Sequence, residues 1–448
     1  MLKDARGLTL TLTDATALDA YERALAAART YRGDPIAPLD EAFAIDPGFA
    51  AAYVTKALLL MTFSERRFAA NALATLDAGA AALARATPRE QALAAAARGL
   101  ATGQWEAGTA ALDRVLVDHP RDILALQVAH VMDFYRGDHL NLRNRVSRVL
   151  PAWTPSVPAY SFVLGMHAFG LEECNQYPEA EAAGLRALSL APEDCWAVHA
   201  VTHVMEMQGR IDEGIAFLES RRPDWATPDN GFAFHNWWHL ALFHLDRDEP
   251  GRALAIYDEV LGGAAHDLSV SRLDATSLLW RLQLEGAAVG KRFDAVADAW
   301  ERQLDAEAGF YAFNDFHAAL AFAATGRAGA IVRLRKTLEA AAWEKGSNGE
   351  MTRAVGLDLC EAAIAFGEER FDAAVAKLEA VRDIASRFGG SHAQRDLLTL
   401  TLIEAACRSG QHRLAQHYAH ERIVHKPASR WGWRLVERAT RRKEPAHA

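Results

Sequence analysis

Residues 94–120, A-A-A-A-R-G-L-A-T-G-Q-W-E-A-G-T-A-A-L-D-R-V-L-V-D-H-P, join two apolar segments through a short polar turn at Gly103. Residues 169–192, F-G-L-E-E-C-N-Q-Y-P-E-A-E-A-A-G-L-R-A-L-S-L-A-P, repeat the same order of features. Alanine and leucine favour helix, glycine commonly ends a helix, and proline cannot continue one. Each stretch therefore predicts two helices joined by a tight turn.

The same unit recurs along most of the chain, with an aromatic residue two positions after the turn and a proline at the end. One pair of helices cannot bury its apolar face alone, so neighbouring pairs must stack into a continuous core. The spacing and these markers resemble the tetratricopeptide repeat. The turn markers are Gly103 and Gly137, and Asn175 and Gly209, each 34 residues apart, with Gly290 and Gly326, 36 apart; the aromatic and proline markers are Trp105, Tyr177, Pro120, Pro192 and Pro427.

We therefore predict an all-α protein, an α-solenoid of tetratricopeptide-like helical hairpins that form a right-handed superhelix. The first helix should lie near residues 14–31, and helix pairs should follow to about residue 425. No linker rich in Ser, Gly and Pro divides residues 1–448, so a single domain is expected. Residues 151–158, P-A-W-T-P-S-V-P, should interrupt the helices and mark a kink, and residues 430–448 should form a basic C-terminal tail.

Composition and charge exclude several classes of function. Of the 448 residues, 50% are hydrophobic and 24% are charged, as in ordinary globular proteins. With 49 Lys and Arg against 58 Asp and Glu, the net charge is −9, which lacks the basic footprint that nucleic-acid binding requires. No segment is long and apolar enough to predict a membrane span.

The cysteines and the N-terminus bear on the compartment. The N-terminal residues lack the apolar core and small-residue cleavage site of a secretory signal. The four cysteines contain no C-x-x-C pair and suit free thiols in a reducing compartment. We therefore expect a cytoplasmic protein, with monomer and dimer both open. The cysteines are Cys174, Cys195, Cys360 and Cys407.

Two helical segments carry an unusual group of histidines. Residues 195–207 read C-W-A-V-H-A-V-T-H-V-M-E-M, and residues 235–239 read H-N-W-W-H. An i, i+4 spacing places both rings of a pair on one helix face. When positions are counted from the turns at Gly209 and Asp248, these polar residues face the concave groove of a tetratricopeptide-like solenoid. They are His199 with His203, His235 with His239, and Glu206.

Three interpretations of this cluster stay open. The first is a metal site, with His203, His239 and Glu206 as ligands of Zn²⁺ or another divalent transition ion. The second is a pocket without metal, in which a carboxylate tunes histidine for acid/base catalysis. The third is ordinary helix packing with satisfied imidazoles. The candidate catalytic residues are His199, His203, Glu206, His235 and His239.

Neighbouring residues are candidates for binding a substrate. Trp196 and Trp238 are candidates for walls of the groove, with a place in the core as the equal alternative for each, whereas Trp237 falls at a packing position. Arg281 and Glu285 are spaced i, i+4, which fits either an intrahelical ion pair or an arginine held for a substrate carboxylate. Cys360 should be a small buried residue, and a nucleophile only beside a histidine. The full set of candidate substrate-binding residues is Trp196, Asn236, Trp238, Arg281, Glu285, Asn314, Asp315 and Arg395.

At these residues the sequence resembles the tetratricopeptide repeat protein 38 family. The motifs that carry the resemblance are W-A-V-H-A-V-T-H-V-M-E-M (196–207), H-N-W-W-H-L-A-L (235–242), W-R-L-Q-L-E-G-A-A-V-G-K-R (280–292), F-N-D-F-H (313–317), G-L-D-L-C (356–360) and G-G-S-H-A-Q-R-D (389–396). The resemblance implies where a site lies and assigns no reaction. By position it implies His199, His203, Glu206, His235, Asn236, Trp238, His239, Arg281, Glu285, Asn314, Asp315, Cys360, Gln394, Arg395 and Asp396.

Two functions of different classes follow from these patterns. The first is a small-molecule pocket on the concave face, with hydrolytic chemistry by His and Glu or by a metal that they hold. The second is a scaffold that binds a peptide or protein. The carboxylate clamp of peptide-binding tetratricopeptide proteins uses Lys, Asn and Arg, whereas this groove offers His, Trp and Glu. The sequence therefore favours the small-molecule pocket.

Overall fold

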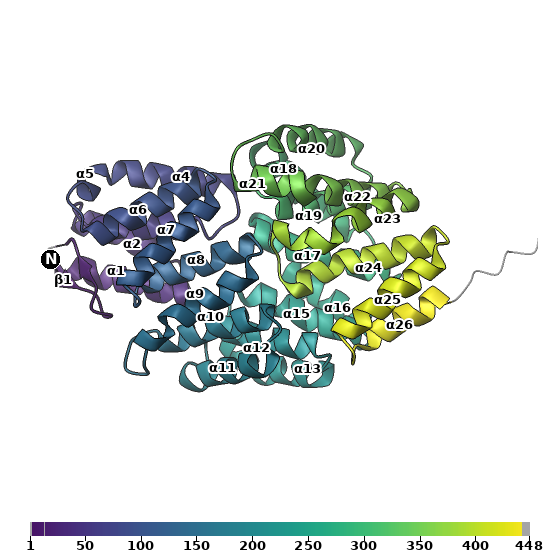
Figure 1. Ribbon diagram of the computed structural model, residues 1–448, viewed down its shortest axis with the longest axis horizontal. Helices are drawn as coiled ribbons and strands as arrows, with labels where there is room; N and C mark the ends of the chain where they lie inside the picture. The colour runs from purple at the N-terminus through teal and green to yellow at the C-terminus, as the bar shows by residue number, and fades with distance from the viewer. Residues whose placement is uncertain (1, 13, 441–448) are drawn as a thin grey trace, which may run out of the picture. The chain divides into compact units, whose positions relative to one another are not determined.

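Helices make up nearly all of the computed structural model, which describes residues 2–12 and 14–440 (Figure 1). Successive helices are joined by short turns into hairpins, which confirms the prediction of an all-α, tetratricopeptide-like architecture. In the described residues, the only strands form a small antiparallel ribbon near the N-terminus. In this ribbon β1 (Leu2–Lys3) pairs with β2 (Thr9–Leu10), and Leu2 lies opposite Leu10.

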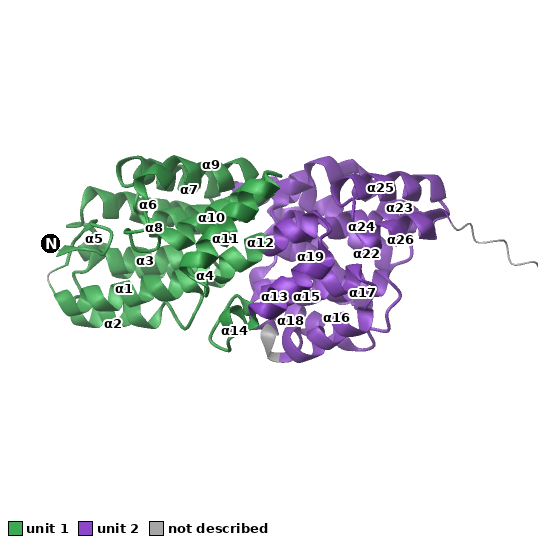
Figure 2. Ribbon diagram, turned by 90° about the horizontal axis from the view of Figure 1, so that it is seen from below, with its two compact units in different colours: residues 1–201, 222–233 green, residues 202–221, 234–448 purple. Residues whose placement is uncertain are grey.

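The hairpins group into two compact units (Figure 2). Unit 1 contains residues 1–201 and 222–233, and unit 2 contains residues 202–221 and 234–448. The boundary falls inside helix α12 (Cys195–Met207), at a point that no composition change marks. The sequence predicts one continuous solenoid, and each unit has the hairpin architecture that this prediction requires.

Unit 1 is built from antiparallel helix neighbours, such as α6 with α7 and α9 with α10. Its helices are α1 (Ala15–Thr30), α2 (Ala37–Ile45), α3 (Ala50–Leu60), α4 (Arg66–Ala78), α5 (Ala80–Leu83), α6 (Pro88–Ala101), α7 (Trp105–Asp118), α8 (Ile123–Tyr135), α9 (His139–Val149), η1 (Leu150–Ala152), α10 (Tyr160–Glu173), α11 (Tyr177–Leu190), the first half of α12, and α14 (Arg222–Trp225).

Unit 2 continues the pattern, and α17 packs directly against α24 although they are far apart in the chain. Besides the end of α12, its helices are α13 (Ile211–Ser220), α15 (Ala233–Asp246), α16 (Pro250–Ile256), η2 (Tyr257–Leu261), η3 (Gly263–Asp267), α17 (Ser269–Leu284), α18 (Arg292–Glu307), α19 (Ala312–Thr325), α20 (Ala328–Ala341), α21 (Ser347–Met351), η4 (Thr352–Gly356), α22 (Leu357–Gly367), α23 (Phe371–Val381), η5 (Arg382–Phe388), α24 (His392–Arg408), α25 (His412–His425) and α26 (Arg430–Thr440).

The turns between helices fall where the sequence places them. Asn175, Gly209 and Asp248 have φ angles of 60°, 69° and 66°, in the left-handed region. A left-handed residue just after a helix closes its last turn and redirects the chain, so the next helix runs back along the first. The three turn positions that set the repeat register are therefore confirmed.

Two predicted boundaries can be compared with the helices. Helix α9 ends at Val149, η1 contains Pro151, and α10 begins only at Tyr160, so no α-helix runs through residues 151–158, while the kink expected there stays a prediction. The predicted basic tail is corrected, because its first part forms helix α26. This helix carries Arg438, which lies 2.7 Å from Glu285 at the end of α17 and ties α26 to that helix within unit 2. Residues 441–448 of the predicted tail lie outside the described residues.

No helix in the described part of the chain is long and apolar enough to cross a membrane.

Small residues set the distance between packed helices. A methyl group on Gly170 of α10 would lie 2.4 Å from the carbonyl oxygen of Leu142 on α9. This contact is with rigid backbone, so α9 and α10 would have to separate to accept a side chain. By contrast, Gly329 of α20 has open space where a methyl group would stand.

These two glycines predict opposite effects of the same substitution. Gly170→Ala should lower the free energy of unfolding by about 1–3 kcal/mol, because it forces packed helices apart. Gly329→Ala, the matched control, should raise it by about 0.5–1 kcal/mol, because alanine restricts the unfolded chain and favours helix. Urea unfolding followed by circular dichroism measures both. Equal effects of the two variants would contradict close packing at Gly170.

Candidate functional site

Two histidines of α15 are held by carboxylates from neighbouring helices of unit 2. The Nδ1–H of His239 donates to Oε2 of Glu206 over 2.9 Å, and the Nδ1–H of His235 donates to Oδ2 of Asp274 over 2.7 Å. All four side chains are buried. A carboxylate at Nδ1 fixes the orientation of the ring and directs Nε2 to the opposite side, as in histidines that bind metals.

The rings of unit 2 converge on one place. The ring centroid of His239 lies 4.5 Å from that of His203 and 4.9 Å from that of His235. One ring nitrogen from each of these three histidines lies within 4.8 Å of the other two. The last part of α12 and the first half of α15 therefore bring His203 together with His235 and His239, the pair that the sequence places four residues apart on α15.

His199, the fourth predicted histidine, belongs to unit 1. It lies one turn before His203 on α12, and its ring centroid is 5.2 Å from Trp196, 5.0 Å from Phe169 and 5.3 Å from Phe232. Within unit 1 its ring therefore packs among aromatic side chains.

Glu206 also contacts a lysine that the sequence analysis does not single out. Nζ of Lys426 donates to Oε1 of Glu206 over 2.9 Å, and both side chains are buried. Burial alone would raise the pKa of Glu206, but Lys426 and His239 outweigh it and hold this pKa well below its usual value. Burial, with His203 nearby, holds the pKa of His239 well below its usual value. The pair is therefore an ionised carboxylate beside a neutral imidazole.

The lysine belongs to a longer buried chain of charges. Nζ of Lys426 lies 3.7 Å from Oδ2 of Asp396, and Arg422 donates to both oxygens of Asp396 over 2.9 and 2.8 Å. Asp396 comes from the segment at residues 389–396, which the sequence analysis links to the site. It reaches the histidines through Lys426 and Glu206. No sequence pattern marks Lys426, which lies 220 residues from Glu206.

Trp238 is part of the core, which corrects its predicted role as a groove wall. It is 0% exposed, its indole N–H donates to Ser277 Oγ over 2.9 Å, and Cζ of Arg281 lies 5.3 Å from the ring centroid. Trp237, predicted as the core residue, is the half-buried one. The hydrogen-bond partner of Trp238 lies on α17 of the next hairpin. Numbering the positions within one repeat does not predict such a contact between repeats.

Arg281 is also engaged inside unit 2. Its guanidinium donates to the carbonyl oxygen of Ala393 over 2.8 Å, and burial lowers its pKa to about 10. Glu285 pairs with Arg438 of α26 at 2.7 Å. The intrahelical pair of Arg281 with Glu285, one of the two expectations, is therefore replaced by contacts to different helices.

The remaining predicted binding residues have local partners. Asp315 accepts from the backbone N–H of Gly309 over 3.1 Å and fixes the turn before α19. Arg395 donates to the carbonyl oxygen of Gly390. Gln394 completes a capping box with Ser391, the N-cap of α24. Asn236 is buried, and Asn314 is half-buried on α19.

Cys360 behaves as the sequence predicts for a small buried residue. It is buried in α22, and burial raises the pKa of its thiol well above the usual value. A thiol in this state is a poor nucleophile. The four cysteines are all free.

Comparison with known proteins bears on the fold. No protein-family model matches the chain. The chain is similar to the crystal structure of the APC/C hetero-tetramer Cut9–Hcn1, with 12% identity and a TM-score of 0.43 over 95% of this chain and 76% of the other. It is similar to the human IFIT1 dimer with PPP-AAAA, with 12% identity and a TM-score of 0.42 over 96% and 95%. A tetratricopeptide repeat protein from Parabacteroides merdae gives 10% identity and a TM-score of 0.29 over 74% and 99%.

The chain has the fold of the tetratricopeptide-repeat proteins. Its own helical hairpins and left-handed turns establish this. The identities and TM-scores of the similar structures are too low to say what this chain binds.

The buried pair of Lys426 and Glu206 predicts a strong energetic coupling. Lys426→Met should lower the free energy of unfolding by about 3 kcal/mol, because it leaves a buried carboxylate without its cation. With Glu206→Gln added, the loss should be smaller than the sum of the two single losses by more than about 1 kcal/mol. A double-mutant cycle by urea unfolding measures this coupling.

The exposed pair of Lys377 and Asp358 supplies the control. Lys377→Met should change stability by less than about 0.5 kcal/mol, because exposed ion pairs contribute little. Additive losses at Lys426 and Glu206 would show that the two side chains do not stabilise each other.

Proposed function

We propose that unit 2 binds one divalent transition-metal ion through ring nitrogens of His203, His235 and His239. The observation that carries this proposal is the pair of Nδ1–carboxylate hydrogen bonds, at 2.9 Å to Glu206 and 2.7 Å to Asp274. Such bonds set the tautomer and orientation of metal-binding histidines. Three imidazoles suit Zn²⁺ best among the common ions, and Co²⁺ can replace it as a spectroscopic probe.

Glu206 takes a different part in this proposal from the one predicted. Its two oxygens accept hydrogen bonds from His239 and Lys426. We therefore assign Glu206 to orienting His239 and assign the third ligand position to His235. Asp274 performs the same orienting role for His235.

The ion would serve hydrolysis of a small molecule. A zinc ion with three protein ligands keeps a fourth position for water or substrate, and it lowers the pKa of bound water. In this proposal His203, His235 and His239 hold the ion, while Glu206 and Asp274 keep two of the rings in place. The resemblance to the tetratricopeptide repeat protein 38 family supports a site at these residues. A cytoplasmic setting remains the prediction from the sequence.

A second candidate function is a scaffold that binds a peptide or another protein. The helical-repeat fold favours it, because stacked hairpins present extended binding surfaces. The burial of Trp238 and Arg281 also favours the scaffold. Both side chains form hydrogen bonds inside unit 2, so they stabilise the packed helices and do not face a small ligand. In this candidate the histidine centre is structural.

Metal analysis of the full-length protein tests the first proposal. We expect about one zinc ion per chain after purification, and a Co²⁺ absorption spectrum typical of tetrahedral nitrogen ligands after exchange. His203→Gln and His235→Gln should each weaken Co²⁺ binding at least about tenfold, since each removes one ligand. His244→Gln is the control, because His244 lies on α15 and contacts Glu249 at 2.7 Å instead of the other histidines.

Loss of Co²⁺ binding in the control as severe as in His203→Gln would contradict the site, as would a wild-type protein without stoichiometric metal. Zinc-dependent turnover of small ester or amide substrates would then support hydrolysis. A metal-free wild type with no turnover, together with a purified partner that binds it in a one-to-one complex, would favour the scaffold.

A further inference from the structure

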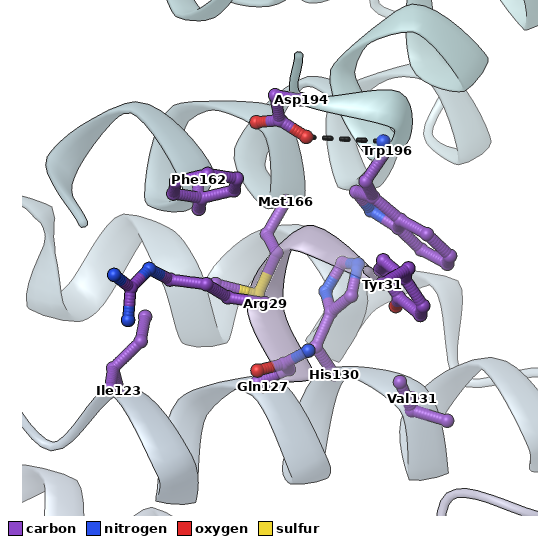
Figure 3. Close-up of a pocket in the computed structure, with 10 residues that line it drawn as sticks. All are labelled: Arg29, Tyr31, Ile123, Gln127, His130, Val131, Phe162, Met166, Asp194 and Trp196. Carbon is purple, nitrogen blue, oxygen red and sulfur yellow. Dashed lines mark hydrogen bonds between the residues drawn. The ribbon is translucent and has the colours of Figure 1, made fainter. Parts of the chain in front are cut away.

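Unit 1 contains a cavity (Figure 3). Its lining comes from α1, α8, α10 and the start of α12, and includes Arg29, His130, Phe162, Asp194 and Trp196. The cavity volume is about 20 Å³, with about 320 Å³ of empty space when the open solvent at its mouth is included. The inner part can hold only one or two groups of the size of water.

Several polar atoms around this cavity have no hydrogen-bond partner among the described residues. They include Nε and Nη1 of Arg29, Oδ2 of Asp194 and the indole Nε1 of Trp196. Asp194 is 1% exposed and Trp196 is 8% exposed. Buried polar atoms are almost always satisfied, so a group of unsatisfied ones around one cavity indicates a ligand.

The contacts of Asp194 show that only one of its oxygens serves the fold. Oδ1 accepts from the backbone N–H of Trp196 over 3.1 Å and of Ala197 over 3.0 Å, which caps α12. Figure 3 shows the other oxygen pointing away from the bond to Trp196. The fold therefore uses Oδ1 and leaves Oδ2 for another partner.

The chemistry of the lining is rich in donors. A guanidinium from Arg29 and an indole N–H from Trp196 both require an acceptor, and the guanidinium prefers an anion. Phe162 and Met166 add an apolar wall, and Cζ of Arg29 lies 5.7 Å from the Phe162 ring centroid. A planar carboxylate fits the donors, and a short hydrocarbon body fits the wall.

We propose that this cavity binds the carboxylate of a small organic acid, with Arg29 as the charged donor and with Phe162 and Met166 against its hydrocarbon part. The carboxylate group is small enough to fit in the inner part of the cavity. The hydrocarbon part of the acid extends through the open mouth of the cavity. Asp194 adds a further donor when it is protonated.

The charge of Asp194 makes the binding depend on pH. Burial raises the pKa of Asp194 to about 7, and the backbone N–H groups of Trp196 and Ala197 oppose this shift only in part. The charged and titratable groups near it are Arg29, Tyr31, His130 and Glu193. Burial lowers the pKa of His130 to about 3 and raises that of Tyr31, so both stay neutral between pH 6 and pH 8.

The direction of the pH effect follows. Below about pH 7 the carboxyl of Asp194 is protonated, and its O–H donates a hydrogen bond to the ligand carboxylate. Above about pH 7 Asp194 is ionised and repels the ligand. The affinity should therefore fall as the pH rises from 6 to 8, by up to about tenfold per pH unit in the upper half of this range.

Calorimetric titration of the full-length protein with acetate, propionate and benzoate at pH 6 tests the proposal. We expect saturable one-to-one binding of at least one of these acids. Arg29→Met should weaken that binding at least about tenfold. Arg23→Met is the matched control on α1, because Arg23 is exposed and pairs with Glu41, and it should leave binding unchanged.

Asp194→Asn provides a second variant that keeps an acceptor for the α12 cap. It should retain binding at pH 6 and abolish the dependence on pH between 6 and 8. Chloride and inorganic phosphate are titrated in parallel, and equal binding of either would overturn the preference for a carboxylate. Absence of saturable binding by all three acids, or equal affinity of the Arg29 and Arg23 variants, would overturn the site.

Discussion

A single buried ion pair, Lys426 with Glu206, joins parts of unit 2 that are far apart in the sequence. The ammonium group holds one carboxylate oxygen at 2.9 Å, and the other oxygen holds His239 at 2.9 Å. Asp396 and Arg422 extend the same network from α24 and α25. Charges removed from water are stable only with complete partners, so the position of each helix constrains the others. The order of the histidine centre depends on this mutual constraint.

The sequence predicts the helices and turns well, because local chemistry decides them. Left-handed turns at Asn175, Gly209 and Asp248 follow from residues that tolerate positive φ, and the pairing of imidazoles follows from a spacing of four. The sequence does not predict the hydrogen-bond and ion-pair partners of the buried side chains. Lys426 carries no motif, and the roles of Trp237 and Trp238 are opposite to the prediction. Hydrogen bonds between neighbouring hairpins depend on how the hairpins pack. The position of a residue within its repeat does not predict them.

The two units show two ways in which a helical repeat can carry polar chemistry. In unit 2 carboxylates fix the orientation of His235 and His239. In unit 1 several polar atoms around one cavity lack partners, including Oδ2 of Asp194. A stack of hairpins provides rigid helix ends for both arrangements, because most of the energy of each hairpin lies in contacts with its neighbours.

The separation of 220 residues between Glu206 and Lys426 has a consequence for biosynthesis. A ribosome makes the chain from the N-terminus, so α12 and α15 leave the exit tunnel long before α25 does. During this interval the acidic partner of His239 lacks its cation, and the nascent centre stays incomplete. The early hairpins can form while translation continues, since each requires only its neighbours. The histidine centre, by contrast, is complete only after α25 and Lys426 have been made.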